Sequence, residues 1–188
     1  MGKTSVGKTT FMLFLAQQIY RATNQPILII EQELADFLVF EKMIALATGT
    51  DPEIIESLWR ISSEDNTPAF EELVESANEN FKGIYVLPIG GLSSEEKIKH
   101  IEFFKEKIGK PVIVFEDYLG LTKDKGISEQ ERMGTSAKAT VDIAKRCDVV
   151  YLALGQVNRA AGDDPSSPLH LSSSRDSGHI ENSFANIF

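Results

Sequence analysis

The feature that most constrains this chain is its glycine-rich first segment, Met1-Gly-Lys-Thr-Ser-Val-Gly-Lys-Thr-Thr10. Gly2, Gly7, Lys8 and Thr9 fit G-x-x-x-x-G-K-[ST], in which glycines let backbone N–H groups turn inward around phosphates. Lys8 would reach the β- and γ-phosphates of a nucleotide, and the Thr9 hydroxyl would coordinate Mg²⁺. The predicted phosphate-binding loop (P-loop) comprises Gly2, Lys3, Thr4, Ser5, Val6, Gly7, Lys8, Thr9 and Thr10.

The position of this loop is unusual, because a P-loop normally follows a buried β-strand. Met1 stands where that strand would end, so we expect either a fragment or a fold lacking the strand. A glycine-rich terminus could also mimic the pattern by chance. The apolar helix expected directly after Thr9, whose positive N-terminal end would face the phosphates, favours a real P-loop.

Composition narrows the class of protein. The 188 residues suggest one domain over 1–188, and 42% hydrophobic with 25% charged residues is ordinary for a globular chain. No segment has the length and apolarity of a membrane span, and no signal peptide is visible, so we expect a cytoplasmic protein. The net charge of −9 argues against broad, nonspecific binding of nucleic acid. The single cysteine, Cys147, is expected in the core.

Helical and extended segments alternate along the chain, which predicts an α/β fold with a mainly parallel sheet flanked by helices. Residues 120–134 are polar and are expected to form a loop that carries mixed charge or contacts a polyanion. The expected helices are 9–20, 34–48, one starting at Asp51-Pro52, 68–80, one starting at Ser93 or Ser94 and running through 108, and 136–146. The expected strands are 27–30, 83–88, 112–115 and 149–154.

Two strands end in acidic residues. Glu31 and Glu33 follow the first strand and would share a face if that strand continued, and either could orient or deprotonate an attacking water. Asp117 follows the strand 112–115, which is the Walker B pattern of an acid that holds Mg²⁺. Solvated strand ends are the alternative interpretation in both places. The charges of the helix that ends at 108 are interpreted as a solvated face.

The motifs in order resemble a known family. They are Gly-x-x-x-x-Gly-Lys-Thr, Ile-Leu-Ile-Ile-x-x-Glu, Asp-Tyr-Leu-x-Leu, Gly-Gln-Val-Asn-Arg and Arg-Asp-Ser-Gly-x-Ile-Glu. Together they resemble the C-terminal, RecA-type motor domain of DnaB-like replicative helicases, with RecA and RadA proteins as wider relatives. The resemblance spans essentially the whole chain and implies a RecA-like P-loop NTPase fold with ATP and Mg²⁺ as cofactors.

The resemblance also implies roles for individual residues. Lys8 and Thr9 would bind phosphate and Mg²⁺, and Asp117 would be the Walker B acid. Glu33, rather than Glu31, resembles the catalytic glutamate that polarises water. Gln156 resembles the residue that senses the γ-phosphate and relays its loss to DNA-binding loops.

The partners implied are single-stranded DNA and identical subunits in a hexameric ring. The loops after Leu121 and after Arg159 would face the central channel of that ring. The candidate contacts to DNA phosphates are Lys123, Lys125, Arg132 and Arg159.

The chain departs from the family pattern at both ends. The strand before the P-loop, and the strand and basic segment that follow the position of Phe188, are absent. Because the P-loop strand neighbours the strand bearing Gln156 in RecA-type sheets, residues 149–154 would form an exposed, apolar edge. We therefore expect a truncated motor domain that binds nucleotide but is weakly active as an isolated chain.

Two other functions fit the motifs less well. A RecA- or RadA-like recombination ATPase would share the P-loop and the Walker B acid. A non-hydrolysing, ATP-binding regulatory module would need neither Glu33 nor Asp117. The leading interpretation is an ATP-dependent DNA helicase motor.

Overall fold

The computed structural model describes residues 7–62, 68–126 and 128–155. Their contacts form two compact units. The sheet unit comprises the described parts of 1–8, 25–33 and 85–188, and the helical unit comprises 9–24 and 34–84. Each unit is described by itself. The prediction of one domain over 1–188 stays a prediction.

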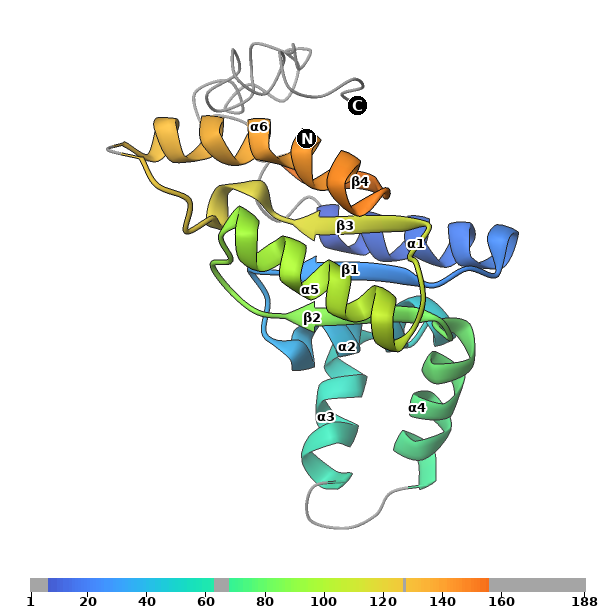
Figure 1. The fold of residues 1–188 in the computed structure, drawn as a ribbon. Coiled ribbons are helices and arrows are strands. Elements are labelled where there is room, and N and C mark those ends of the chain that lie inside the picture. The colour runs from blue at the N-terminus through green and yellow to red at the C-terminus, as the bar shows by residue number, and fades with distance from the viewer. Residues whose placement is uncertain (1–6, 63–67, 127, 156–188) are drawn as a thin grey trace, which may run out of the picture. The chain divides into compact units, whose positions relative to one another are not determined.

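The sheet has four strands in the order β2-β1-β3-β4 (Figure 1). Its strands are β1 (Ile27–Glu31), β2 (Ile84–Pro88), β3 (Ile113–Asp117) and β4 (Val150–Ala153). β1 pairs in parallel with β3, and β3 pairs in parallel with β4. All five residues of β1 and all five of β3 are buried, which explains their nearly continuous apolar sequences. The predicted α/β fold with a parallel sheet is confirmed.

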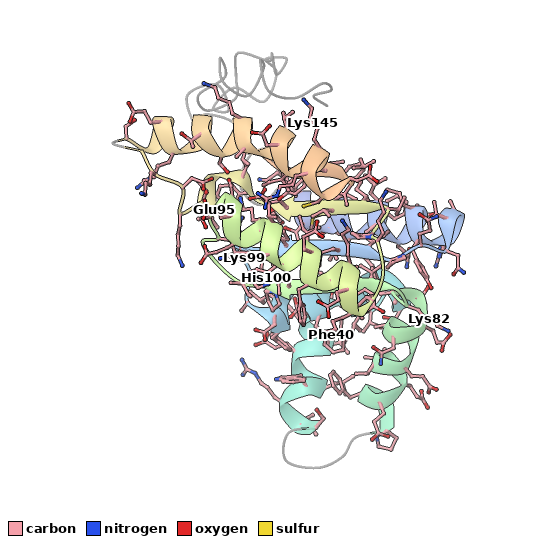
Figure 2. All side chains as sticks on the ribbon, viewed as in Figure 1. Phe40, Lys82, Glu95, Lys99, His100 and Lys145 are labelled. Carbon is pink, nitrogen blue, oxygen red and sulfur yellow. The ribbon has the colours of Figure 1, made fainter. Side chains whose placement is uncertain are left out.

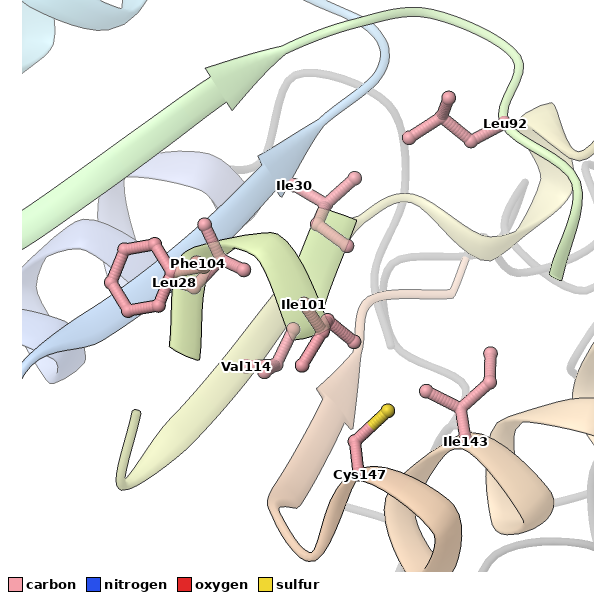
Figure 3. Close-up of a cluster of buried hydrophobic side chains, with 8 residues drawn as sticks. All are labelled: Leu28, Ile30, Leu92, Ile101, Phe104, Val114, Ile143 and Cys147. Carbon is pink, nitrogen blue, oxygen red and sulfur yellow. The ribbon is translucent and has the colours of Figure 1, made fainter. Parts of the chain in front are cut away.

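One face of the sheet packs against α5 (Ser94–Lys107) and α6 (Glu129–Cys147), which also contact each other. Alternate strand residues supply the apolar side chains on this face, because successive side chains of a strand point to opposite sides. Cys147 is 0% exposed in this cluster, so its predicted place in the core is confirmed. The cluster comprises Leu28, Ile30, Leu92, Ile101, Phe104, Val114, Ile143 and Cys147 (Figure 3).

The helical unit contains α2 (Asp36–Thr48), α3 (Pro52–Ser62), α4 (Pro68–Asn80) and most of α1 (Lys8–Thr23). α2, α3 and α4 pack against one another around Ile44, Ile55, Phe70 and Ala77. The Trp59 ring lies 5.1 Å from the Phe37 ring and 5.6 Å from the Phe70 ring, measured between centroids. Packing accounts for this tryptophan, as the sequence predicted.

The segment 120–134 differs from its prediction as a loop. Leu119–Leu121 forms a short 3-10 helix, and α6 begins at Glu129. The Ser128 side chain accepts a hydrogen bond from the Glu131 N–H, which satisfies an N–H group that the first helical turn leaves without a partner. The predicted helix 136–146 therefore starts about two turns earlier than expected.

The helix α5 corrects a second prediction. Its start is a capping box, in which the Ser93 hydroxyl accepts from the Glu96 N–H and the Glu96 carboxylate accepts from the Ser93 N–H. Glu95 and Lys99 are exposed on this helix (Figure 2), in line with a solvated face. Lys97, however, is only 1% exposed, so the helix does not carry all its charges in solvent.

At the other end of the sheet order, β4 is the edge strand of the described sheet. Val150 at its start is 61% exposed, as expected for an apolar residue on such an edge. No helix among the described residues is both long and apolar enough to cross a membrane.

Candidate functional site

The carboxyl edge of the sheet brings together two of the strand-end acids. Glu31 of β1 and Asp117 of β3 are partners in the parallel ladder, so their side chains leave the sheet on the same face. They are 1% and 0% exposed. Two buried carboxylates thus lie side by side where ligands bind in open α/β sheets.

Glu33 lies two residues beyond the end of β1. The strand does not continue to it, so the shared face expected for Glu31 and Glu33 is not formed. Instead, the chain turns, and the Glu33 N–H donates to Glu31 Oε1 at 2.8 Å. Glu33 is exposed, whereas Glu31 is buried. Of the two acids, Glu33 is therefore the one that solvent reaches.

The described part of the predicted P-loop is its final glycine and the start of α1. Gly7 has a φ of +84°, which favours glycine. Lys8 is the first residue of α1 and Thr9 and Thr10 follow in its first turn, all three half-buried. Gly2, Lys3, Thr4, Ser5 and Val6 lie outside the described residues.

Beyond β4 the described chain reaches Gly155, so Gln156 and Arg159 lie outside it. Up to that point the segment is tied to the edge that carries the acids. The Leu154 N–H donates to the Glu116 carbonyl at 2.8 Å, and the Leu154 carbonyl accepts from the Leu119 N–H at 3.1 Å. β4 thereby brings its carboxyl end to the same edge as Asp117.

The basic candidates Lys123 and Lys125 are exposed on the segment between the 3-10 helix and α6, and Arg132 is exposed on α6. Between the two lysines, the Asp124 carboxylate accepts from the Ser94 N–H at 2.8 Å and the Ser94 hydroxyl at 2.6 Å. Burial would raise the pKa of Asp124, but these hydrogen bonds and the Lys97 charge outweigh it and lower that pKa. The basic segment is thus anchored to the start of α5.

The sequence analysis missed a buried polar network on the opposite face from Asp117. Glu116 accepts from Lys97 Nζ at 2.6 Å, from Gln32 Nε2 at 2.7 Å and from the Tyr151 hydroxyl at 2.9 Å. Glu116 is 0% exposed and Gln32 is 7% exposed. Burial, followed by the Glu116 charge and hydrogen bond, raises the pKa of Tyr151 well above its usual value.

Two sequence signals could have located this network. Lys97 is spaced four and seven residues before Ile101 and Phe104, so it falls on the buried stripe of its helix. Glu116 alternates with the apolar Val114 on a buried strand. Opposite charges at two core-facing positions indicate a buried pair.

The oxygen donors present fit a magnesium nucleotide. Mg²⁺ prefers oxygen ligands, and the Asp117 carboxylate and Thr9 hydroxyl are of this kind. The positive φ of Gly7 and the helix start at Lys8 suit a phosphate, because helix N-termini bind anions.

A parallel sheet with acids at its carboxyl edge, a Gly-Lys-Thr helix start and this strand order define a RecA-like α/β fold of the P-loop class. The family described as the DnaB-like helicase C terminal domain matches residues 1–187. The chain belongs to this family.

Curated relatives agree. The chain is 25% identical over 185 residues to the replicative DNA helicase DnaC of Bacillus subtilis, covering 95% of this chain and 39% of that protein. It is 24% identical over 182 residues to the replicative DNA helicase DnaB of Geobacillus stearothermophilus, with the same coverage of 95% and 39%. The chain thus spans about two fifths of these relatives.

Solved structures show the same fold. One of them, an isolated ATPase domain, superposes with a TM-score of 0.80 at 22% identity, covering 97% of this chain and 64% of that one. A DnaB-like replicative helicase, from a study of its interactions with primase, gives a TM-score of 0.80 at 22% identity, covering 97% and 43%.

Proposed function

We propose that this chain is the ATP-binding and ATP-hydrolysing motor domain of a DnaB-like DNA helicase, which couples hydrolysis to translocation on single-stranded DNA and duplex unwinding in replication. The observation that carries the proposal is the carboxyl edge of the sheet. There, Glu31 and Asp117 are buried register partners and Glu33 is exposed beside them. Membership of the DnaB-like family supports the same function.

Each residue of the site has a distinct role in this proposal. Lys8 binds the β- and γ-phosphates, and Thr9 and Asp117 hold Mg²⁺. Glu33 orients the attacking water and accepts its proton, which suits its exposed position. Gln156 senses the γ-phosphate. When bound, Mg²⁺ supplies positive charge that stabilises the phosphate oxygens.

The partners follow from the same family. The relatives carry the names of replicative DNA helicases. We propose that this chain acts in a hexameric ring around single-stranded DNA. Lys123, Lys125, Arg132 and Arg159 contact DNA phosphates. The net charge of −9 requires these contacts to be local, because the chain as a whole repels a polyanion.

The test is ATP hydrolysis by the full-length gene product, with and without single-stranded DNA. Wild type is expected to show DNA-stimulated turnover. Lys8→Ala and Glu33→Gln are each expected to lose about 100-fold or more in kcat, as when one transition-state contact is removed. Binding of a fluorescent ATP analogue is expected to persist in Glu33→Gln and to be lost in Lys8→Ala.

Lys99→Ala is the matched control for Lys8→Ala, because Lys99 is exposed on α5 away from the carboxyl edge. It should leave both turnover and nucleotide binding unchanged. Tight ATP binding with no turnover in wild type would favour a regulatory binding module instead. Strand exchange without unwinding would favour a recombination ATPase. Unchanged nucleotide binding in Lys8→Ala would contradict the P-loop assignment.

A further inference from the structure

The buried network at Glu116 needs an explanation besides stability. Lys97 and Glu116 are 1% and 0% exposed, and removing two charges from water costs about as much as their attraction returns. Apolar residues of similar size would often give an equally stable fold. What the network does achieve is to fix the residue between Glu31 and Glu33.

That residue is Gln32, whose side-chain amide is held at both ends. Its Nε2 donates to Glu116 Oε1 at 2.7 Å, and its Oε1 accepts from the Leu92 N–H at 2.9 Å. The reverse orientation of the amide would face oxygen against the Glu116 carboxylate, so only one orientation is satisfied. The Gln32 backbone N–H also donates to the Asp117 carbonyl at 2.7 Å. The turn that carries Glu33 is therefore clamped to β3 and to Leu92.

Leu92 continues the connection toward the basic segment. Its carbonyl accepts from the Thr122 hydroxyl at 3.3 Å and from the Lys123 N–H at 3.4 Å. The Lys123 side chain also passes close to Gly91, where an added Cβ would lie 3.0 Å from its Cε. A continuous set of hydrogen bonds thus runs from Gln32 through Leu92 to Lys123, with Leu92 bonded through both its N–H and its carbonyl.

We propose that Gln32 is a positioning residue that orients Glu33 and, through Leu92, couples its position to the basic segment Lys123–Lys125. The proposal rests on the proposed function, since it assigns the partner of each end. Movement of the basic segment on a polyanion changes the bonds to the Leu92 carbonyl, and the Leu92 N–H transmits this change to Gln32. Lys97 and Glu116 keep the Gln32 amide in the orientation that this link requires.

The first test measures the link without turnover, by amide hydrogen exchange in the full-length protein. Gln32→Leu removes the acceptor of the Leu92 N–H, so exchange at Leu92 should rise about tenfold, as for the loss of one hydrogen bond. Exchange at the Lys123 N–H should rise as well. Unchanged exchange at Lys123 would overturn the link, whether or not the protein hydrolyses ATP.

Thr122→Val tests the link from its other end and keeps the proposal falsifiable should Gln32→Leu not fold. It removes one bond to the Leu92 carbonyl and retains the side-chain shape. Exchange at the Leu92 N–H is expected to rise severalfold, and no change there would also overturn the link. Lys125→Ala, a charge change with no bond to Leu92 among the described contacts, should leave this exchange unchanged.

The second test is kinetic. Gln32→Leu should lower kcat by about tenfold or more while KM for ATP changes little, because a misplaced water-orienting group affects the transition state more than binding. Thr122→Val should keep the basal kcat and lose most of the stimulation by single-stranded DNA. Equal effects of Gln32→Leu on kcat and KM, or full stimulation in Thr122→Val, would contradict positioning. A wild type without turnover would count against the proposed function, and hydrogen exchange would then decide the link alone.

Discussion

The sheet unit and the helical unit bury different chemistry. All charged side chains that are buried among the described residues, Glu31, Lys97, Glu116 and Asp117, belong to the sheet unit. The cluster between α2, α3 and α4 in the helical unit is built from aliphatic and aromatic side chains. Burying a charge costs free energy unless it is paired or functional, so its location marks where a fold serves more than stability. Substitutions in each unit test this division.

The largest effect is expected in the sheet unit for Lys97→Met. The substitution leaves the Glu116 carboxylate buried without its cation, and we expect a loss of about 3–5 kcal/mol in the free energy of unfolding by urea. Lys99→Met, on the exposed side of the same helix, should change it by about 0.5 kcal/mol or less. The double variant Lys97→Met with Glu116→Leu should recover most of the loss. A loss below about 1 kcal/mol in the single variant would show that the pair is not a buried one.

Lys97 also shows where prediction from sequence stopped. The sequence predicted helices and strands well wherever local signals were strong, as at Asp51-Pro52, where the Asp51 carboxylate accepts from the Glu53 N–H at 2.8 Å. Proline at its start and an apolar spacing gave α4 its observed bounds. Lys97 was missed because a lysine's charge was weighed above its place on the stripe, and only tertiary pairing explains its burial.

The site was predictable to the same degree. Acids at the ends of buried strands pointed to Asp117 and Glu33, but the register that pairs Glu31 with Asp117 is a tertiary property. Gln32 has no motif and gains its place only through contacts 60 and 84 residues away in sequence. The early start of α6 had a local signal, Ser128-x-x-Glu131, which the polar composition of the segment obscured.

In the helical unit the most sensitive position should be steric. Gly83 has a φ of +79°, and an added Cβ would lie 2.2 Å from Cε2 of the Tyr20 ring. Gly83→Ala is expected to cost about 3 kcal/mol, because backbone strain and overlap add. Gly49→Ala is the matched control, since Gly49 has a φ of +71° with nothing near its Cβ position. It should cost about 1 kcal/mol in the same urea titration. Equal losses would remove the steric argument.

A smaller effect is expected from Cys147, at the end of α6. Burial first, and then the Glu102 carboxylate, raise the pKa of this thiol from 9.0 to about 11. The neutral thiol is thus favoured in the folded state. Its contribution to stability is complete below pH 9.0 and is lost as the pH rises to about 11.

This contribution is on the order of 2 kcal/mol. We expect the free energy of unfolding of wild type to fall between these pH values more steeply than that of Cys147→Ala. Unfolding titrations of both proteins at several pH values measure the difference. Parallel curves would show that the thiol ionises as easily in the folded as in the unfolded protein.

The smallest effect compares helix starts in the two units. Ser93 begins a capping box before α5, and Asp51 caps α3. Ser93→Ala and Asp51→Ala should each cost about 1 kcal/mol, since both remove one side-chain acceptor from a first-turn N–H. Ser57→Ala, exposed within α3, should cost less than about 0.5 kcal/mol. Similar losses at the two caps would show that local helix signals stabilise both units alike. The difference between the units would then lie in the buried charges alone. A much larger loss at Ser93 would instead indicate that its neighbours Leu92 and Ser94, bonded to Gln32 and Asp124, make this helix start part of the site.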